Sequence, residues 1–112
     1  MVEVAIQALA GSEVQPFWRA VLGYTERGGP YDLVDSHGWG PTIGLQPMDA
    51  PRPQRNRIHV DISVPHDQAK ARVAAAIAGG GHLVTDQYAP PWWVLADAEG
   101  NEACVATWMG RN

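Results

Sequence analysis

Cysteine and long apolar runs are the features that this 112-residue sequence has least of. Cys104 is the single cysteine, so the chain cannot form an internal disulfide, and we expect a protein of the reducing cytoplasm. No segment approaches the roughly 20 apolar residues of a membrane-spanning helix, and the N-terminus carries no apolar stretch typical of a secretion signal. We therefore expect a cytoplasmic protein with no membrane partner.

Basic residues are also scarce. Eight Lys and Arg stand against twelve Asp and Glu, giving a net charge of −4, which argues against nucleic acid or an anionic membrane as a partner. Tryptophan, in contrast, is plentiful: the five Trp suit a pocket or a subunit interface as well as a core. The length is that of one domain, large enough to bury a core and fold alone.

The stretch 56–64 organises the chain. Its even-numbered positions from 58 onward are apolar and its odd-numbered positions are polar, which predicts a strand with one face on a core. His59 and Asp61 lie two residues apart and therefore share the polar face. An imidazole and a carboxylate pointing into the same space make this face the first candidate for a functional site.

A similar order of elements surrounds this strand on both sides. Before it, the pattern predicts a strand at 2–8, a helix that starts with a capping box at Ser12 and Gln15 and ends at Gly23, and strands at 24–27, 31–34 and 42–46. A Pro-rich linker at 50–55 follows.

After the central strand, the segment from Pro65 opens a second helix, which the glycines at 79–81 end. Its apolar stripe consists of Ala69, Val73, Ala76 and Ile77. Strands are predicted at 82–85, 92–96 and 102–108, with a type I turn at 97–100 that a left-handed glycine closes.

Each half therefore reads strand, helix, strand, strand, strand, and this internal repeat carries the fold prediction. A shift of 56 residues places Glu3 on His59 and Gln46 on Glu102, so side chains able to bind metal superpose on one another. We expect a single α+β domain, with unit one at 1–49, the linker at 50–55 and unit two at 56–112. Eight strands exclude a ferredoxin-like domain, which needs only four.

Two copies of this unit resemble the vicinal oxygen chelate superfamily of glyoxalase I, bleomycin-resistance proteins, fosfomycin-resistance enzymes and extradiol dioxygenases. The segment 17–24, Phe-Trp-Arg-Ala-Val-Leu-Gly-Tyr, resembles its first-helix signature. The segment 97–101, Asp-Ala-Glu-Gly-Asn, resembles its Asp-Pro-x-Gly-Asn turn, with Ala98 in place of proline. Together, 56–61 and 100–105 resemble the subgroup of glyoxalase-like domains.

The resemblance implies two βαβββ units that form a curved, half-barrel mixed sheet with the helices on the convex side, and a homodimer. It also implies a divalent metal (Zn, Ni, Fe, Mn or Mg), or none in members that only bind. Carried over by position, the ligands are Glu3, a residue near Gln46, His59 and the position of Cys104. Relatives have glutamate at that last position, whereas this chain has its glutamate two residues earlier, at Glu102.

We therefore name His59, Glu102 and Glu3 as candidate metal ligands, and Glu102 and Asp61 as candidate catalytic groups. Each has a structural alternative. His59 suits an inert hydrogen bond in a polar cavity, and Asp61 suits an ion pair with Arg57 or Arg19. Glu3 suits a position at the chain end, and Glu102 a solvent-facing strand end.

Candidate substrate-binding residues are Gln46, Trp39, Trp93 and Cys104. Trp39 lies between two glycines and could act as a lid over an apolar ligand. Trp93 and its neighbour Trp92 point to opposite faces of a strand, so at most one lines the cavity. Gln46 could equally close a strand edge, and Cys104 could be a small buried residue.

These expectations lead to two functions of different classes. The first is a glyoxalase-like protein acting on a small oxygen-rich organic molecule, with a divalent metal as Lewis acid in lyase or isomerase chemistry. The second is a metal-free protein that binds and sequesters a small molecule. A regulatory or interaction module is a third alternative.

Overall fold

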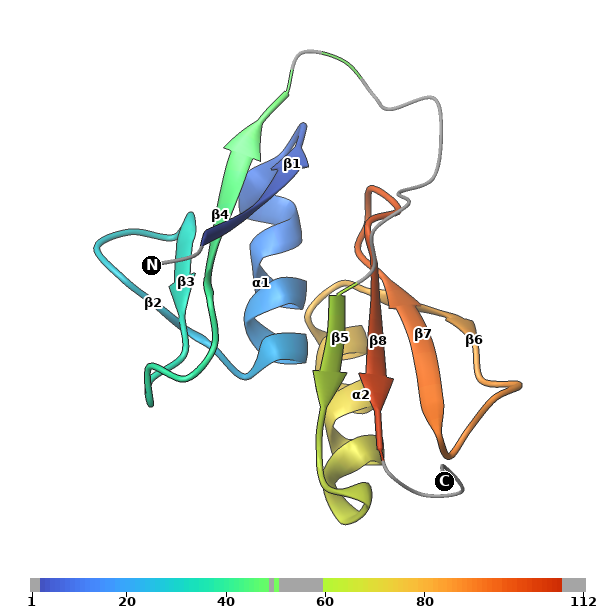
Figure 1. Cartoon of the computed structure of the whole chain (residues 1–112). Helices are drawn as coiled ribbons and strands as arrows, with labels where there is room; N and C mark the ends of the chain where they lie inside the picture. Colours follow the sequence, from blue (N-terminus) through green and yellow to red (C-terminus); the bar gives the residue numbers. More distant parts are fainter. Residues whose placement is uncertain (1–2, 49, 51–59, 108–112) are drawn as a thin grey trace.

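The computed structural model describes residues 3–48, 50 and 60–107 and consists of two units with the same order of elements (Figure 1). The elements of unit one are β1 (Glu3–Ala8), α1 (Gly11–Leu22), β2 (Thr25–Glu26), β3 (Asp32–Val34) and β4 (Thr42–Pro47). Those of unit two are β5 (Val60–Ser63), the 3₁₀ turn η1 (His66–Gln68), α2 (Ala69–Ala78), β6 (His82–Thr85), β7 (Trp92–Ala96) and β8 (Glu102–Ala106). The predicted repeat is confirmed, while the linker 50–55 lies outside the described residues except for Ala50.

Each unit forms its own four-stranded mixed sheet, with strand order β1-β4-β3-β2 in the first and β5-β8-β7-β6 in the second. In both, the strand before the helix pairs in parallel with the last strand of the unit, and the remaining pairs are antiparallel. The two sheets do not close into a barrel, which agrees with the predicted α+β half-barrel of two βαβββ units.

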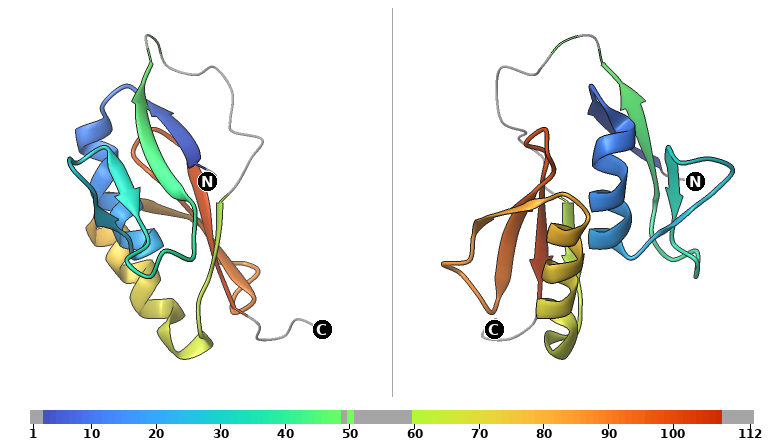
Figure 2. Two further views of the ribbon diagram at one scale, coloured as in Figure 1. Left: turned by 60° about the vertical axis from the view of Figure 1, so that its left-hand side comes forward. Right: turned by 180° about the vertical axis from the view of Figure 1, so that it is seen from behind.

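Both helices cover the same side of the two sheets, as the view from behind in Figure 2 shows. We call this side of each sheet the helix face and the opposite side the site face. The core lies between the sheets and the helices and contains, among others, Phe17 and Trp18 of α1, Leu33 of β3 and Leu95 of β7. Its large apolar side chains are almost completely buried, which supplies the main stabilising term of the fold.

The helices begin differently from the prediction. The N-cap of α1 is Ala10, without a side-chain cap, so the predicted capping box at Ser12 is wrong: Gly11 already belongs to the helix. In unit two, the segment 66–68 is a 3₁₀ turn and α2 starts at Ala69. Ile77, predicted for the apolar stripe, is 44% exposed, because the buried side of α2 consists of Ala69, Val73 and Ala76.

Unit two holds α1 at both ends. The carboxylate of Glu99 accepts hydrogen bonds from the backbone N–H groups of Leu9 and Ala10, at 2.7 and 2.8 Å. At the other end, the guanidinium of Arg72 donates to the carbonyl of Val21 at 3.1 Å. An anion near the N-terminus and a cation at the C-terminus both match the helix dipole, so these contacts fix the orientation of the two units.

Glycine is required where Arg72 approaches. Gly23, the predicted helix stop, is confirmed as a left-handed C-cap with φ 71°. A Cβ at this position would lie 3.1 Å from the guanidinium nitrogens of Arg72. Gly23 therefore ends α1 and also makes room for the side chain that caps it.

Candidate functional site

The site face of the second sheet gathers most of the predicted residues of unit two. In the strand register, Asp61 lies beside Cys104, and Cys104 lies beside Val94. Residues paired in register share a face, and Glu102 shares this face because it is two positions from Cys104 on β8. The helix face of the same strands carries Val60, Ala103, Val105 and Leu95, which belong to or pack on the core.

Cys104 and Asp61 interact directly. Cys104 is 7% exposed, and its thiol donates a hydrogen bond to the carboxylate of Asp61. Burial contributes most to raising the pKa of Cys104, followed by the negative charge of Asp61, this hydrogen bond and the charge of Glu102, and together they raise it to about 11. The thiol is therefore neutral at physiological pH, so it serves as a hydrogen-bond donor and not as a nucleophile.

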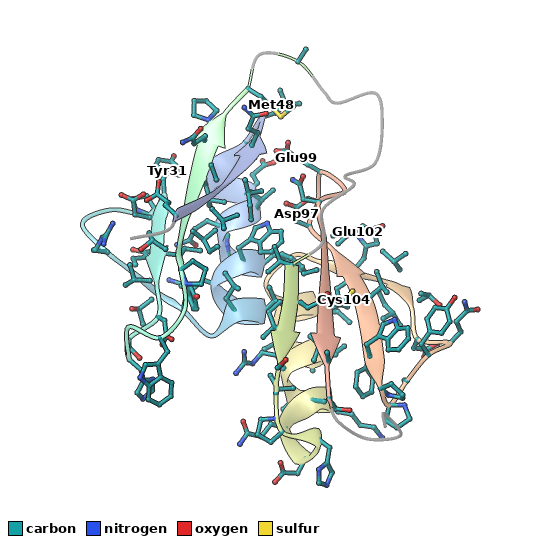
Figure 3. All side chains as sticks on the ribbon, in the orientation of Figure 1. Tyr31, Met48, Asp97, Glu99, Glu102 and Cys104 are labelled. Carbon is teal, nitrogen blue, oxygen red and sulfur yellow. The ribbon has the colours of Figure 1, made fainter. Side chains whose placement is uncertain are left out.

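Glu102 is buried although it lies on the face turned away from the core, with 6% of its surface exposed. It opens β8, directly after the turn that ends at Asn101 (Figure 3). Of the alternatives for this residue, the structure thus favours an inward-facing carboxylate over a solvent-facing strand end. Glu102, Cys104 and Asp61 are brought together by two neighbouring parallel strands.

The two adjacent tryptophans, Trp92 and Trp93, point to opposite faces of β7, as expected. Trp93 was the predicted substrate-binding residue, but it packs against the core beside Val105. Trp92 lies on the site face beside Ala106, and its ring stacks on Tyr88 with centroids 4.9 Å apart. Choosing between the two tryptophans requires the pairing of β7 with β8. The sequence alone shows only that their side chains point to opposite faces.

His82 is a residue of this face that the sequence reasoning missed. In the register, His82 lies beside Ala96, which lies beside Glu102, so the imidazole and the carboxylate share a row across β6, β7 and β8. His82 is exposed on an edge strand. The predicted strand 82–85 shows which residues share a face with His82. The pairing with β7, which aligns His82 with Glu102, comes only from the fold.

The candidates of unit one lie on the site face of the first sheet. Glu3 pairs with Thr42, while Gln46 pairs with Gln7, four residues further along β1. This separation is ~13 Å, so Glu3 and Gln46 do not meet one small group together. Beside Glu3 stands another acid instead: a Cβ at Gly44 would lie 3.4 Å from Oε1 of Glu3 and 3.8 Å from Oδ1 of Asp32.

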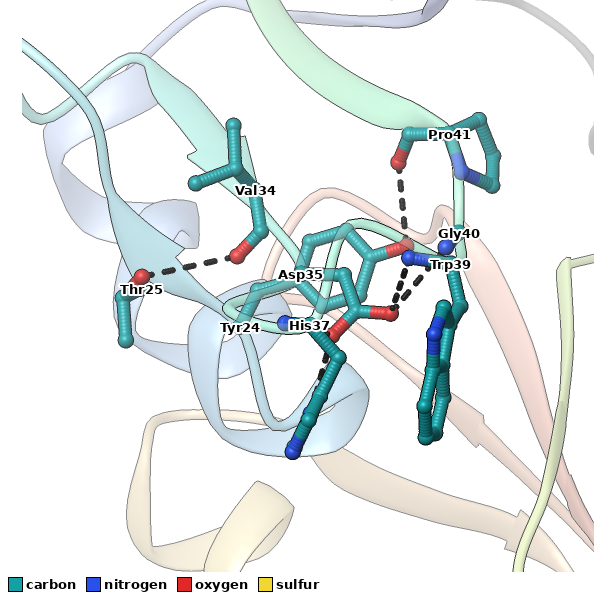
Figure 4. Close-up of polar contacts among 8 residues, drawn as sticks. All are labelled: Tyr24, Thr25, Val34, Asp35, His37, Trp39, Gly40 and Pro41. Carbon is teal, nitrogen blue, oxygen red and sulfur yellow. Dashed lines mark hydrogen bonds and ion pairs between the residues drawn. The ribbon is translucent and has the colours of Figure 1, made fainter.

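Trp39, the predicted lid, lies on the turn between β3 and β4 and is 84% exposed. The carboxylate of Asp35 holds this turn by accepting hydrogen bonds from the backbone N–H groups of His37, Trp39 and Gly40, at 2.9, 3.1 and 3.0 Å (Figure 4). These bonds lower the pKa of Asp35, with the one from His37 contributing most. Trp39 is therefore presented by an ordered turn.

His59 lies outside the described residues, and so does Arg57, one proposed partner of Asp61. Arg19, the other, pairs with Glu26 at 3.3 Å instead. Within residues 3–48 and 60–107, no three His, Cys, Asp or Glu side chains form a group that could hold a metal ion. In the same part of the chain, no helix is long and apolar enough to cross a membrane.

The sequence from residue 3 to residue 106 matches the model of the glyoxalase-like domain family. The chain belongs to that family. The match covers both units, so the membership rests on nearly all of the sequence and agrees with the resemblance found in its motifs. Among proteins of curated function, none matches this sequence.

Solved structures show the same fold at low sequence identity. A glyoxalase/bleomycin resistance protein from Albidiferax ferrireducens T118 is 21% identical, with a TM-score of 0.71 over 96% of this chain and 97% of that one. A glyoxalase/bleomycin resistance protein/dioxygenase family enzyme from Burkholderia phytofirmans PsJN is 19% identical, with a TM-score of 0.67 over 94% and 95%.

The fosfomycin resistance protein FosX from Listeria monocytogenes, solved as a complex with Mn(II) and sulfate, is also similar. It is 9% identical, with a TM-score of 0.73 over 96% of this chain and 88% of FosX. At these identities the likeness establishes the fold of this glyoxalase-like domain, and the substrate has to be argued from its own residues.

Proposed function

We propose that this glyoxalase-like domain binds a small oxygen-rich organic molecule against the site face of its second sheet. One observation carries the proposal: Glu102 is a buried carboxylate on a face that the core does not use, next to Asp61 and Cys104. The carboxylates supply acceptors for hydroxyl groups. Trp92 and Val94 supply apolar surface on the same face.

In the catalytic form of this proposal, Glu102 or Asp61 moves a proton to or from the carbon or oxygen that reacts. Glu102 suits the role because the protein around it excludes water, whereas Asp61 is exposed and already accepts the thiol of Cys104. Trp92 and Cys104 then orient the molecule by contact. The reaction class is that of a lyase or isomerase.

A divalent metal is part of that proposal, and the side chains near Glu102 can be compared with the ligands that such a metal prefers. Glu102 offers a suitable oxygen ligand, while Cys104 offers a protonated thiol at the position where the resemblance implies glutamate. The described residues therefore fit a metal only in part, and His59 has to be the second ligand, with Glu3 or Gln46 assisting. A bound metal would polarise adjacent oxygens of the substrate as a Lewis acid. FosX shows that a relative binds Mn(II).

Metal-free binding is the second candidate, and the Cys104–Asp61 hydrogen bond favours it. This bond occupies a carboxylate oxygen and keeps the thiol neutral, which suits recognition of a polar molecule without an ion. The stack of Tyr88 on Trp92 beside this face provides a flat apolar surface of the kind that holds small organic ligands.

Two measurements separate the candidates. Elemental analysis of protein purified without chelator, followed by Mn(II) titration of the wild type, His59→Ala and Glu102→Gln, tests the metal. Stoichiometric metal that both variants lose supports the catalytic form. Ligand binding that survives complete metal removal supports the second candidate. Glu13→Gln, an exposed acid on α1, is the matched control and should change neither result.

A further inference from the structure

Rows of side chains cross the site face of the second sheet, and the pairing of its strands defines them. From the start of β8 to its end, the rows are His82–Ala96–Glu102, Val94–Cys104–Asp61 and Trp92–Ala106–Ser63. None of these described residues belongs to the hydrophobic core. Because each strand advances two residues between rows, successive rows lie ~7 Å apart and the whole set spans ~13 Å. The face is therefore long enough to contact two different parts of one small molecule.

Polar groups gather at the start of β8. Glu102 is buried in the first row, and His82 lies at the other end of that row, with only the small side chain of Ala96 between them. Figure 3 shows Glu102 and Cys104 following one another along β8. Beside Cys104, the carboxylate of Asp61 on β5 is exposed. This end of the face therefore suits the hydroxyl groups of a ligand.

Apolar surface follows β7 away from Glu102. Val94 is 8% exposed, and Trp92, two positions earlier on the same face, is half-buried. The ring of Trp92 stacks on that of Tyr88, with centroids 4.9 Å apart and planes inclined by 20°. Tyr88 is 45% exposed. Exposure thus increases from Glu102 to Tyr88, so the carboxylate lies at the covered end of the face and the two aromatic rings lie at its open end.

The loop before β7 holds the two aromatic rings in place. The N–H of Trp92 donates to the carbonyl of Tyr88 at 3.5 Å. Thr107, which follows β8 and is buried, donates its hydroxyl to the carbonyl of Pro90 at 2.6 Å and its N–H to the carbonyl of Pro91 at 2.8 Å. An aromatic surface ordered in this way binds a planar group without a further cost of ordering itself.

These features give the ligand a direction on the face, an inference that rests on the proposed function. We propose that the ligand is amphipathic: its hydroxyl-bearing end binds Glu102, and a flat apolar group lies over Val94 against the stacked rings of Trp92 and Tyr88. The spacing of the rows places the two parts of the ligand ~7–13 Å apart. A molecule without the flat group occupies only the covered end and binds more weakly. Trp92 and Tyr88 therefore determine specificity, while Glu102 binds the part that all ligands share.

Three neutral probes with the same diol test the proposal: the methyl, phenyl and cyclohexyl monoethers of glycerol. Amide chemical shifts of the ¹⁵N-labelled protein give the dissociation constant of each. The phenyl ether should bind roughly tenfold or more tightly than the methyl ether, because it buries a ring. It should also bind more tightly than the cyclohexyl ether, because only a flat ring stacks on Trp92.

Substitutions locate the preference for the phenyl ring. Trp92→Leu keeps an apolar side chain but removes the flat ring, so it should remove most of the preference for the phenyl over the methyl ether. Tyr88→Ala, which changes an exposed side chain, should reduce the same preference. Tyr31→Ala is the matched control, since this ring of unit one is 48% exposed against 45% for Tyr88, and it should leave the three dissociation constants unchanged. Circular dichroism checks that each variant is folded.

The outcomes separate this inference from the proposed function. Equal affinities for the phenyl and methyl ethers, a cyclohexyl ether that binds as tightly as the phenyl ether, or a preference that survives both Trp92→Leu and Tyr88→Ala would overturn the inference. If the three ethers bind equally and Glu102→Gln weakens them alike, the proposed function stands while this inference fails. If no ether shifts the amides of β8, both fail.

Discussion

The indole N–H of Trp18 on α1 donates a hydrogen bond of 2.9 Å to the carboxylate of Asp97 in the other unit. Both side chains are almost completely buried, and Asp97 also accepts the N–H groups of Glu99 and Asn101 and the side-chain amide of Asn101. One carboxylate thus satisfies donors from its own turn and from the helix of unit one. This explains physically why the Phe-Trp and Asp-x-x-Gly-Asn motifs occur together in one chain.

Asp97→Ala should therefore destabilise the protein by about 3 kcal/mol, because it leaves several buried donors without an acceptor. Urea unfolding followed by circular dichroism measures the change. Asp86→Ala is the control: this aspartate is exposed, and its replacement should stay within about 0.5 kcal/mol. Equal effects of the two variants would mean that the junction contributes little to stability.

Gly23→Ala should cost about 1–2 kcal/mol, since the left-handed backbone at φ 71° disfavours any Cβ and Arg72 occupies the space. Gly29→Ala is a matched control in the next turn, where a Cβ would meet nothing within 4 Å. The difference between the two melting temperatures reports the cost. A neutral Gly23→Ala variant would show that the C-cap relaxes without loss.

The stability of the protein should depend on pH in the acid range through Asp35. Hydrogen bonds from the N–H groups of His37, Gly40 and Trp39 and the charge of His37 hold its pKa below the ordinary value of 3.8. The unfolded chain therefore binds the proton more readily, and the stabilising contribution of Asp35 is present above pH 3.8 and lost as the pH falls through the lower folded pKa. Carboxyl NMR titration of the wild type, with Asp35→Asn to assign the signal, measures this. A folded pKa at or above the ordinary value would contradict it.

Cys104 should resist alkylation in the native protein at neutral pH, because burial and two nearby carboxylates raise its pKa to about 11. Asp61→Asn removes one of these charges and should increase the rate of reaction with iodoacetamide at alkaline pH. Protein unfolded in urea gives the reference rate of a free thiol. Fast labelling of the native wild type would show that the thiol is not held as described.

The sequence predicted the order of elements well because the repeat, the apolar alternation and the glycine stops are local signals. The strands at 82–85 and 92–96 have the predicted bounds, and Gly100 is left-handed as expected. The predicted start of α1 was wrong because the carbonyl of Ala10 already accepts the N–H groups of Glu13 and Val14, so the helix begins at Gly11 without a side-chain cap.

The site was predicted in part for the same reason. Alternation placed Glu102 and Cys104 on one face of their strand and Asp61 on the polar face of its own, since parity along a strand is visible in sequence. The pairing that brings Asp61 beside Cys104 comes from the register. Three features depend instead on the register between strands: the face that carries Trp92, the alignment of His82 with Glu102, and the residue beside Glu3. Register is a tertiary property, so no single stretch of sequence contains it.

The central claim is that the site face around Glu102 binds the ligand, and amide chemical-shift mapping tests it most directly. Titration of the ¹⁵N-labelled protein with a panel of small hydroxy- and keto-acids should shift the amides of β8, of Asp61 and of Trp92, and Glu102→Gln should weaken that response. Shifts confined to the helices or to the first sheet, or a response that Glu102→Gln leaves unchanged, would contradict the account.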